Sequence, residues 1–161
     1  MCGRLPLKTP ADQLIQMLLP LVSQVRLPED YRSRYNIAPT QSVLGVTHGT
    51  TGNLLTTYRW GLVPAWADDF SIGSRMINAR RETLLEKRSF KGPLGKHRCL
   101  IIADGYYEWK PLNTKSKQAY WITPAKSGIL ALAGLWERNS KVAEKPVESC
   151  TIITTSANSA M

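Results

Sequence analysis

The second half of the chain alternates short apolar stretches with turns, and this pattern limits the fold more than any other sequence feature. The stretch "CLIIADGYYEWK" predicts two strands on either side of a tight turn at Asp104-Gly105, because Asp-Gly pairs favour such turns. Three more strands are expected in "QAYWITP", "GILALAGLWER" and "ESCTIITT". A chain with this many strands and short loops must build a sheet.

The first half adds helices and further strands. A helix is expected over 9–19, with Thr9 as cap, Pro10 in the first turn and an apolar face, ended by Pro20. Strands are expected at 42–47 and 54–64, a polar loop at 65–74 and a short helix over 78–90. We therefore predict a single α+β domain over residues 1–161, with a mainly antiparallel, curled or barrel-like sheet and a few flanking helices. The chain stops directly after a strand, so we expect this domain to lack its C-terminal portion.

The chain is basic, with 21 Lys and Arg against 12 Asp and Glu and a formal net charge of +9. A high pI alone is one interpretation. A polyanionic partner, most often nucleic acid, is the other, and the arginines near Trp and Tyr favour it because guanidinium groups make two-pronged phosphate contacts.

The three cysteines are too far apart in sequence for a disulfide framework or a zinc pattern. The sequence shows no metal or organic cofactor, and we expect none. Cys99 and Cys150 lie in apolar strands and are expected in the core. No apolar run is long enough to span a membrane and no signal peptide is visible. A reducing cytoplasm is the expected location, with the protein at the nucleoid when DNA-bound.

Cys2 lies in no apolar run. Removal of Met1 would leave a cysteine with a free α-amine, and this 1,2-aminothiol can close on an aldehyde to a five-membered thiazolidine. An internal cysteine lacks the amine and cannot do this. The alternative is an ordinary small residue near a terminus.

Other candidates are polar or aromatic residues in unusual places. Glu108 lies between Tyr107 and Trp109, where it is either a general acid or base or an outward-facing strand residue. Asn78 lies at the junction between the loop and the expected helix, and spacing alone favours an N-cap. Of Arg80 and Arg81, one could face a phosphate and the other solvent.

Two loop positions complete the set. Pro39, with Asn36, indicates a rigid turn. Trp66 lies in the polar loop, where it either stacks on a base or anchors the loop. Trp60 is expected in the core, and neither His48 nor His97 is assigned a role.

Seven motifs in order resemble one family: "MCGR", "RYNIAPTQ", "RWGLVPAWA", "INARRET", "RSFK", "RCLIIADGYYEWK" and "ALAGLWE". They resemble the SRAP family, the SOS-response-associated peptidases or abasic-site processing proteins. The resemblance implies a protein that binds abasic sites in single-stranded DNA and crosslinks to their aldehyde through Cys2. We separately expect a monomer. It also implies thiol autopeptidase activity, in which Cys2 attacks the bond before it.

The resemblance also implies roles for particular residues. Cys2, Asn78 and Glu108 match catalytic positions: the nucleophile, a hydrogen-bonding amide and an acid and base. DNA-binding positions are matched by Arg4, Pro39, Trp66, Arg80 and Arg88. The family's active-site histidine follows the last strand, and this chain has no matching stretch. Capture also requires that Met1 is removed.

Three functions follow from the sequence. The first is covalent capture of abasic sites, the second a thiol peptidase with Cys2 as nucleophile, and the third a non-catalytic single-strand binder.

Overall fold

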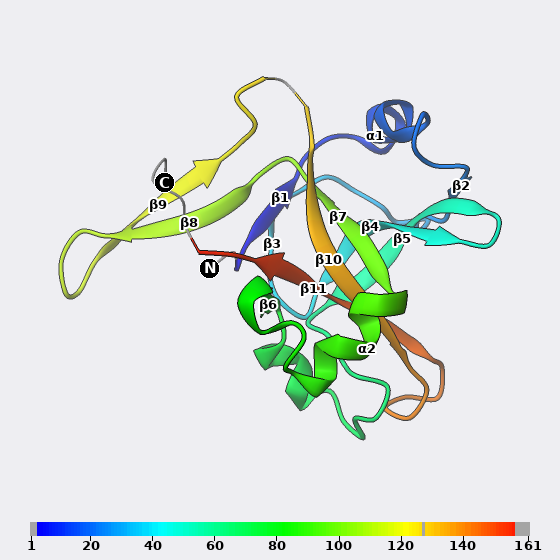
Figure 1. The fold of residues 1–161 in the computed structure, drawn as a ribbon. Coiled ribbons are helices and arrows are strands. Elements are labelled where there is room, and N and C mark those ends of the chain that lie inside the picture. The colour runs from blue at the N-terminus through cyan, green and yellow to red at the C-terminus, as the bar shows by residue number, and fades with distance from the viewer. Residues whose placement is uncertain (1–2, 127, 157–161) are drawn as a thin grey trace.

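A closed five-stranded barrel forms the centre of the protein, seen in a computed structural model that describes residues 3–126 and 128–156 (Figure 1). Around the ring, each strand pairs with the next in antiparallel fashion. A short parallel contact closes the ring, with Ser149 beside Arg59 and Cys150 beside Trp60. The ring order is β5 (Gly52–Trp60), β4 (Ser42–Gly49), β7 (Arg98–Ala103), β10 (Leu130–Asn139) and β11 (Val147–Thr154).

Short elements extend and flank this barrel. Two short strands add to the large sheet: β2 (Gln24–Val25) beside β5 and β6 (Asn78–Arg80) beside β11. A separate pair joins β1 (Leu5–Leu7) to β3 (Arg34–Ile37). The helices are α1 (Ala11–Leu18), α2 (Arg88–Lys96) and the 3₁₀ turns η1 (Ser71–Arg75) and η2 (Arg81–Thr83).

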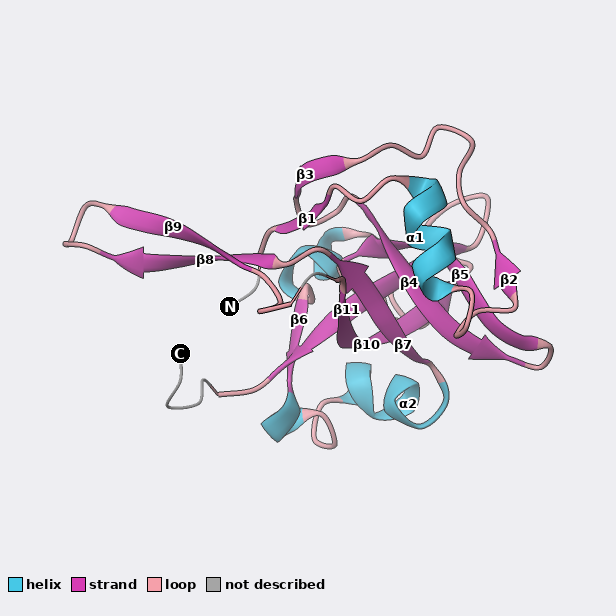
Figure 2. Cartoon of the chain, turned by 90° about the horizontal axis from the view of Figure 1, so that it is seen from above, coloured by secondary structure: helices cyan, strands magenta, loops and turns pink. Residues whose placement is uncertain are grey.

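A hairpin of β8 (Tyr106–Pro111) and β9 (Lys117–Ile122) projects away from the barrel, which both ribbon views show (Figure 2). Its tip residues are exposed, whereas the first residues of β8 are half-buried at the barrel. Glu108 therefore lies where the hairpin leaves the body of the protein.

The barrel interior is apolar. Fully buried residues include Leu55, Trp60 and Ile101, and the indole N–H of Trp60 donates to the carbonyl of Ile77 at 2.9 Å. A smaller cluster under α2 joins Phe90 to Leu135 and their buried neighbours. Within the described residues, no helix is long and apolar enough to cross a membrane.

The predicted α+β class with a curled, barrel-like sheet is confirmed, and so is burial of Cys99, Cys150 and Trp60. The helix predicted over 9–19 exists as Ala11–Leu18, but its cap differs. Thr9 is not the cap, because its hydroxyl donates to Asp104 instead and Pro10 occupies the N-cap position. One domain over 1–161, lacking a C-terminal portion, stays a prediction.

The helix predicted over 78–90 is wrong. Asn78 is not an N-cap, because it begins β6 and pairs with Ile152 of β11. The helix α2 begins only at Arg88 and continues through Pro93, and its own residues Phe90 and Pro93 are buried. Strand pairing outweighs the local helix propensity at Asn78, and burial outweighs the helix-breaking tendency of Pro93.

The turn at Asp104-Gly105 separates two strands, as predicted, but it is not a hairpin turn. β7 pairs with β4 and β10, whereas β8 pairs with β9. The reason is that Asp104 is buried and bonded to the N-terminal segment, so the chain turns away from the barrel there. Sequence patterns also missed β3, which was read as part of a turn.

Candidate functional site

The N-terminal segment runs along the start of β8. The amide N–H of Tyr107 donates to the carbonyl of Arg4 at 3.0 Å, and that of Asp104 donates to the carbonyl of Pro6 at 3.0 Å. Cys2 lies outside the described residues. Cys2 comes two residues before Arg4 in the sequence.

Glu108 follows Tyr107 directly and is therefore one residue from the point where the N-terminal segment is bonded. It is half-buried and lies opposite Tyr120 of β9. A carboxylate at this boundary between interior and solvent can exchange its proton with water, which suits a general acid and base.

The aromatic side chains next to Glu108 brace the base of the hairpin. Tyr107 contacts Trp121 with ring centroids 6.2 Å apart, and its hydroxyl donates to the carbonyl of Tyr35 at 3.0 Å. The ammonium of Lys8 lies 5.1 Å from the centre of the Trp121 ring. The hairpin is thus tied to β3 and to the N-terminal segment at its root.

Asn78 approaches the same side of the molecule from another element. It is half-buried in β6, which is held beside the end of β11 by the pairing of Asn78 with Ile152. Both ribbon views place β6, the end of β11, the start of β1 and the root of β8 on one side of the barrel (Figures 1 and 2). The structure therefore gathers elements that carry Asn78, Glu108 and Arg4.

The predicted arginines occupy different environments. Arg4 donates to the Asn36 side chain at 2.9 Å, next to the N-terminal segment. Arg80 is exposed at the end of β6, opposite Thr154. Arg88 begins α2, and its guanidinium lies 5.1 Å from the centre of the Trp66 ring.

Trp66 is 40% exposed in a loop that is held by a buried side chain. The Asn139 amide donates to the carbonyls of Pro64 and Ala67 at 2.7 and 2.8 Å. Its oxygen accepts the N–H groups of Lys141 and Val142. Trp66 is therefore both anchored through its loop and available on the surface, so the two alternatives for it are compatible.

Pro39 lies in a turn that ends with Thr40 at φ 73°. The Arg59 guanidinium donates to the Thr40 carbonyl at 2.8 Å and lies 5.1 Å from the centre of the Phe70 ring. Sequence analysis did not identify Arg59 or Phe70. Their juxtaposition with Pro39 spans three segments, and no local pattern signals it.

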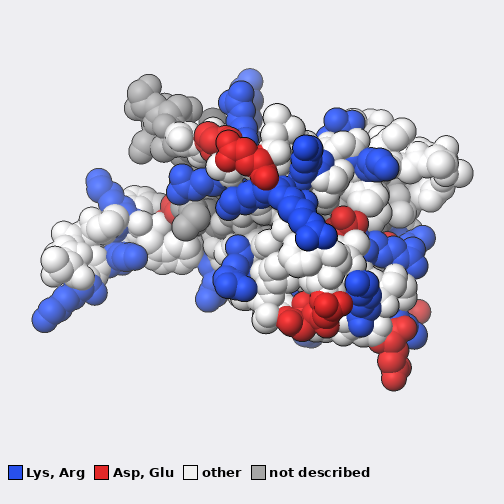
Figure 3. All heavy atoms as spheres, turned by 60° about the horizontal axis from the view of Figure 1, so that its bottom comes forward, with Lys and Arg blue, Asp and Glu red and all other residues white. Residues whose placement is uncertain are grey.

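Basic side chains form a band across the face that points downward in Figure 1, and acidic ones form separate clusters beside it (Figure 3). Such a face suits a phosphate backbone.

The histidines do not join the site elements. His48 bonds to Asn53 at 2.8 Å and His97 lies 3.2 Å from Glu137. Among the described residues, no three potential ligands gather into a metal site.

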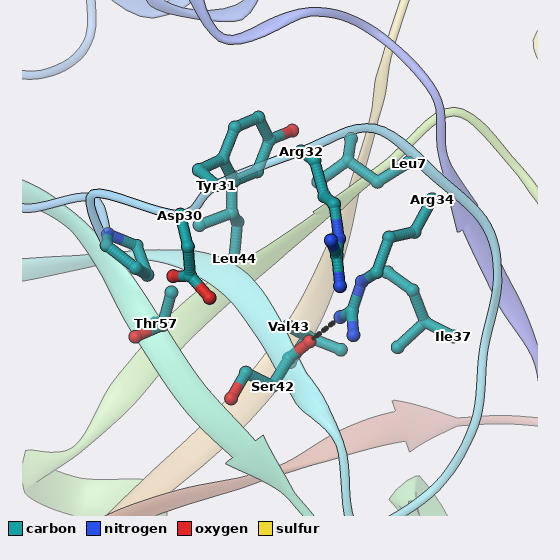
Figure 4. Close-up of a pocket in the computed structure, with 11 residues that line it drawn as sticks. Leu7, Asp30, Tyr31, Arg32, Arg34, Ile37, Ser42, Val43, Leu44 and Thr57 are labelled. Atoms are coloured by element: carbon teal, nitrogen blue, oxygen red, sulfur yellow. Dashed lines mark hydrogen bonds between the residues drawn. The ribbon is translucent and has the colours of Figure 1, made fainter.

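A separate hollow of about 190 Å³ lies between β4 and the segment before β3 (Figure 4). Arg32 and Arg34 point into it, opposite Asp30, and Arg34 donates to the carbonyl of Ser42. Burial, followed by the charge of Asp104, raises the pKa of Tyr31 at its edge. Neither Asn78 nor Glu108 lines this hollow.

The SOS response associated peptidase (SRAP) family model matches residues 1–161. The chain belongs to the SRAP family. It is similar to the abasic site processing protein YoqW of Bacillus subtilis, at 44% identity over 100% of this chain and 71% of that protein. The abasic site processing protein HMCES of Rattus norvegicus is 35% identical over 76% of this chain and 40% of its own length.

Solved structures share the fold of this chain. A crystal structure of a protein from Bacteroides thetaiotaomicron superposes with a TM-score of 0.85 at 25% identity, covering 99% of this chain and 70% of that one. A phage-related protein from Bordetella bronchiseptica has a TM-score of 0.72 at 30% identity, with 96% and 69% covered. The resemblance inferred from the seven sequence motifs is thereby confirmed.

Proposed function

We propose that the protein senses abasic sites in single-stranded DNA, in the cytoplasm, and captures them covalently through Cys2 once Met1 is removed. The observation that carries the proposal is the pairing of Arg4 with Tyr107, because it brings the segment leading to Cys2 beside Glu108. The SRAP relatives named as abasic site processing proteins support the substrate.

The chemistry needs one aldehyde, one amine and one thiol. The α-amine of Cys2 adds to the aldehyde carbon of the ring-opened sugar, and loss of water gives an imine. The Cys2 sulfur then adds to the imine carbon while its proton passes to the nitrogen, which closes the thiazolidine. One water molecule is released overall, and no oxidant or reductant takes part.

This chain's residues have separate tasks in the proposal. Glu108 moves protons while the sugar opens and the ring closes. Asn78 supplies a hydrogen-bonding amide near the reacting atoms. The phosphates are contacted by Arg4, Arg80 and Arg88. Pro39 shapes the turn beside the site, and Trp66 supports the DNA strand. Phosphate contacts set affinity and salt dependence without reading base sequence.

The test uses Met1-free protein, verified by intact mass, and a single-stranded oligonucleotide with one abasic site. We expect a species that survives denaturing electrophoresis and weighs one water less than the sum of its parts. Cys2→Ala abolishes it and Glu108→Gln slows it. A wild-type protein that leaves this DNA unshifted contradicts the proposal, and equal affinity for intact and abasic strands would instead support a simple single-strand binder.

A second candidate is a thiol peptidase, which the family description favours. Here Cys2 attacks a peptide carbonyl and Glu108 assists. Protein made in cells lacking aminopeptidase activity separates the two, because only an autopeptidase then loses Met1. Turnover of added peptides would extend the activity beyond the protein's own N-terminus.

We further propose that the protein is a monomer, which analytical sedimentation would check.

A further inference from the structure

Asp104 is a buried carboxylate at the corner between β7 and β8, with 6% of its surface exposed. One oxygen accepts the backbone N–H groups of Lys8 and Thr9 at 2.5 and 3.0 Å. The other oxygen accepts the Thr9 hydroxyl at 2.5 Å. A single side chain thus binds three donors from a segment about 95 residues away in the sequence.

The same segment is bonded at three further points. The carbonyls of Pro6 and Arg4 accept the N–H groups of Asp104 and Tyr107. From the other side, the Tyr31 hydroxyl donates to the Thr9 carbonyl at 3.3 Å. Because these bonds recur along residues 4–9, sliding this segment by one residue would break all of them together.

This register determines what lies next to Glu108. Arg4 is bonded to Tyr107, so the chain directly before Arg4 and the residue directly after Tyr107 lie close together. Lys8 is exposed and Thr9 half-buried, so the bonds to Asp104 bury little apolar surface at these two residues. Their main effect is on position.

We propose that Asp104 is a positioning residue for the capture reaction: its carboxylate fixes the register that holds the N-terminal amine and thiol beside Glu108. This inference rests on the proposed function of Cys2. Asp104 does not touch the reacting atoms and acts through the backbone of residues 4–9. A misplacement of about 1 Å at a reacting centre can lower a rate by about 100-fold, so register alone can control the rate.

The experiment compares binding and chemistry in the same variants. Asp104→Asn keeps the size of the side chain but replaces one accepting oxygen with a donor. Binding is measured on DNA with a tetrahydrofuran abasic analogue, which has no aldehyde. The first-order rate of capture is measured at saturating protein on DNA with a true abasic site. We expect Asp104→Asn to lower that rate by about 10- to 100-fold while the Kd for the analogue changes less than about threefold.

Two milder variants keep the proposal testable if Asp104→Asn fails to fold. Thr9→Val removes only the hydroxyl bond and should slow capture by roughly three- to tenfold, while Thr9→Ser keeps the hydroxyl and should retain the wild-type rate. Leu135→Ala, a core change in the separate apolar cluster under α2, controls for lost stability and should leave the rate unchanged below its unfolding range. A folded Asp104→Asn protein with the wild-type rate overturns the proposal, as does an equal loss in Leu135→Ala.

Failure of the proposed function looks different. Wild-type protein without any capture overturns the role of Cys2. The register is then read by hydrogen exchange, because the amides of Lys8 and Thr9 should exchange faster in Asp104→Asn than in wild type, whatever the activity. Unchanged exchange at both amides overturns the positioning role by itself.

Discussion

Two buried polar side chains each tie down a segment of this protein, and they do so with different chemistry. Asp104 binds the N-terminal segment through three donors, whereas Asn139 binds the loop around Trp66 through two donated and two accepted bonds. A carboxylate only accepts, so it selects N–H and O–H groups. An amide does both, so Asn139 can bridge two loops that each offer a different group.

The two side chains serve different tasks, because they hold different segments of the protein. The Asp104 side carries the segment that leads to Cys2, and the Asn139 side carries Trp66 with its Arg88 partner. We therefore expect changes near Asp104 to alter the rate of capture, and changes near Asn139 to alter affinity for DNA.

The largest expected difference is in the reactivity of the three cysteines, because capture requires Cys2 to react rather than Cys99 or Cys150. Burial raises the pKa of Cys99 to about 12, and burial followed by the charge of Cys99 raises the pKa of Cys150. The reactive thiolate of Cys99 is therefore about 1,000-fold scarcer than for an ordinary cysteine at pH 8. Alkylation followed by mass spectrometry should modify Cys2 first and the other two only in denaturant.

The same shifts set a pH dependence of stability. In the unfolded chain these thiols release protons near pH 9, whereas the folded Cys99 keeps its proton until about pH 12. The folded state binds more protons in that interval, so the free energy of unfolding falls as pH rises through it. Rapid alkylation of Cys99 in native protein at pH 8 would contradict both expectations.

Asn139→Ala should have the next largest effect. It leaves the carbonyls of Pro64 and Ala67 without a hydrogen-bond donor, which we expect to cost about 4 kcal/mol of unfolding free energy. Thermal unfolding should shift down by about 10 °C. Below that range, the DNA dissociation constant should rise while capture at saturation keeps its rate.

Asn53→Ala is the matched control for Asn139→Ala. Asn53 also donates to a backbone carbonyl, that of Leu21 at 2.7 Å, but in a half-exposed hairpin where water can replace it. Its loss should cost about 1 kcal/mol or less and leave DNA binding unchanged. A slower capture rate in Asn139→Ala at saturating DNA would break the separation of the two tasks.

Arg88→Ala tests the grip on DNA directly. The change removes a positive charge and the contact with Trp66, so we expect about tenfold weaker binding of single-stranded DNA. The slope of log affinity against log salt should become shallower by about 0.7 for one lost phosphate contact. Salt titrations measure both. Arg26→Ala is the control, because Arg26 is exposed directly after β2 and its replacement removes the same charge. Equal losses in both variants would mean that only net charge matters.

Tyr107→Phe should have the smallest effect. It removes the exposed hydrogen bond to the Tyr35 carbonyl but leaves the backbone bond from Tyr107 to Arg4. We expect a loss of about 0.5 kcal/mol in chemical denaturation and an unchanged capture rate. A large fall in rate would show that position at this end depends on side chains as well as on the backbone.

Local sequence patterns predicted what short-range physics controls. The apolar stretches around Cys99 and Cys150 form buried strands, and Trp60 lies in the core as expected. Asp104 illustrates the limit, because Asp-Gly is a turn signal in sequence, yet the carboxylate binds Lys8 and Thr9. Nothing in either stretch indicates the other.

The candidate site divides in the same way. Arg4, Asn78 and Glu108 were selected from motifs, and the structure places their elements on one side of the barrel (Figures 1 and 2). Their individual roles stay predictions. Asn78 was assigned to the wrong element, because only its pairing with Ile152 makes that stretch a strand. Contacts such as Arg59 on Phe70 depend on the fold and could not be read from sequence.

The separation of residues 4–9 from Asp104 along the chain has a consequence during synthesis. The ribosome must add about 95 residues after Thr9 before its partner exists, which takes about 5 to 20 s at ordinary rates. Barrel closure waits still longer, since it needs β11. Throughout this interval the nascent N-terminal segment can bond to Tyr31 and β3 but not to Asp104 or Tyr107, which leaves time for an aminopeptidase to remove Met1 before the segment is fully bonded in place.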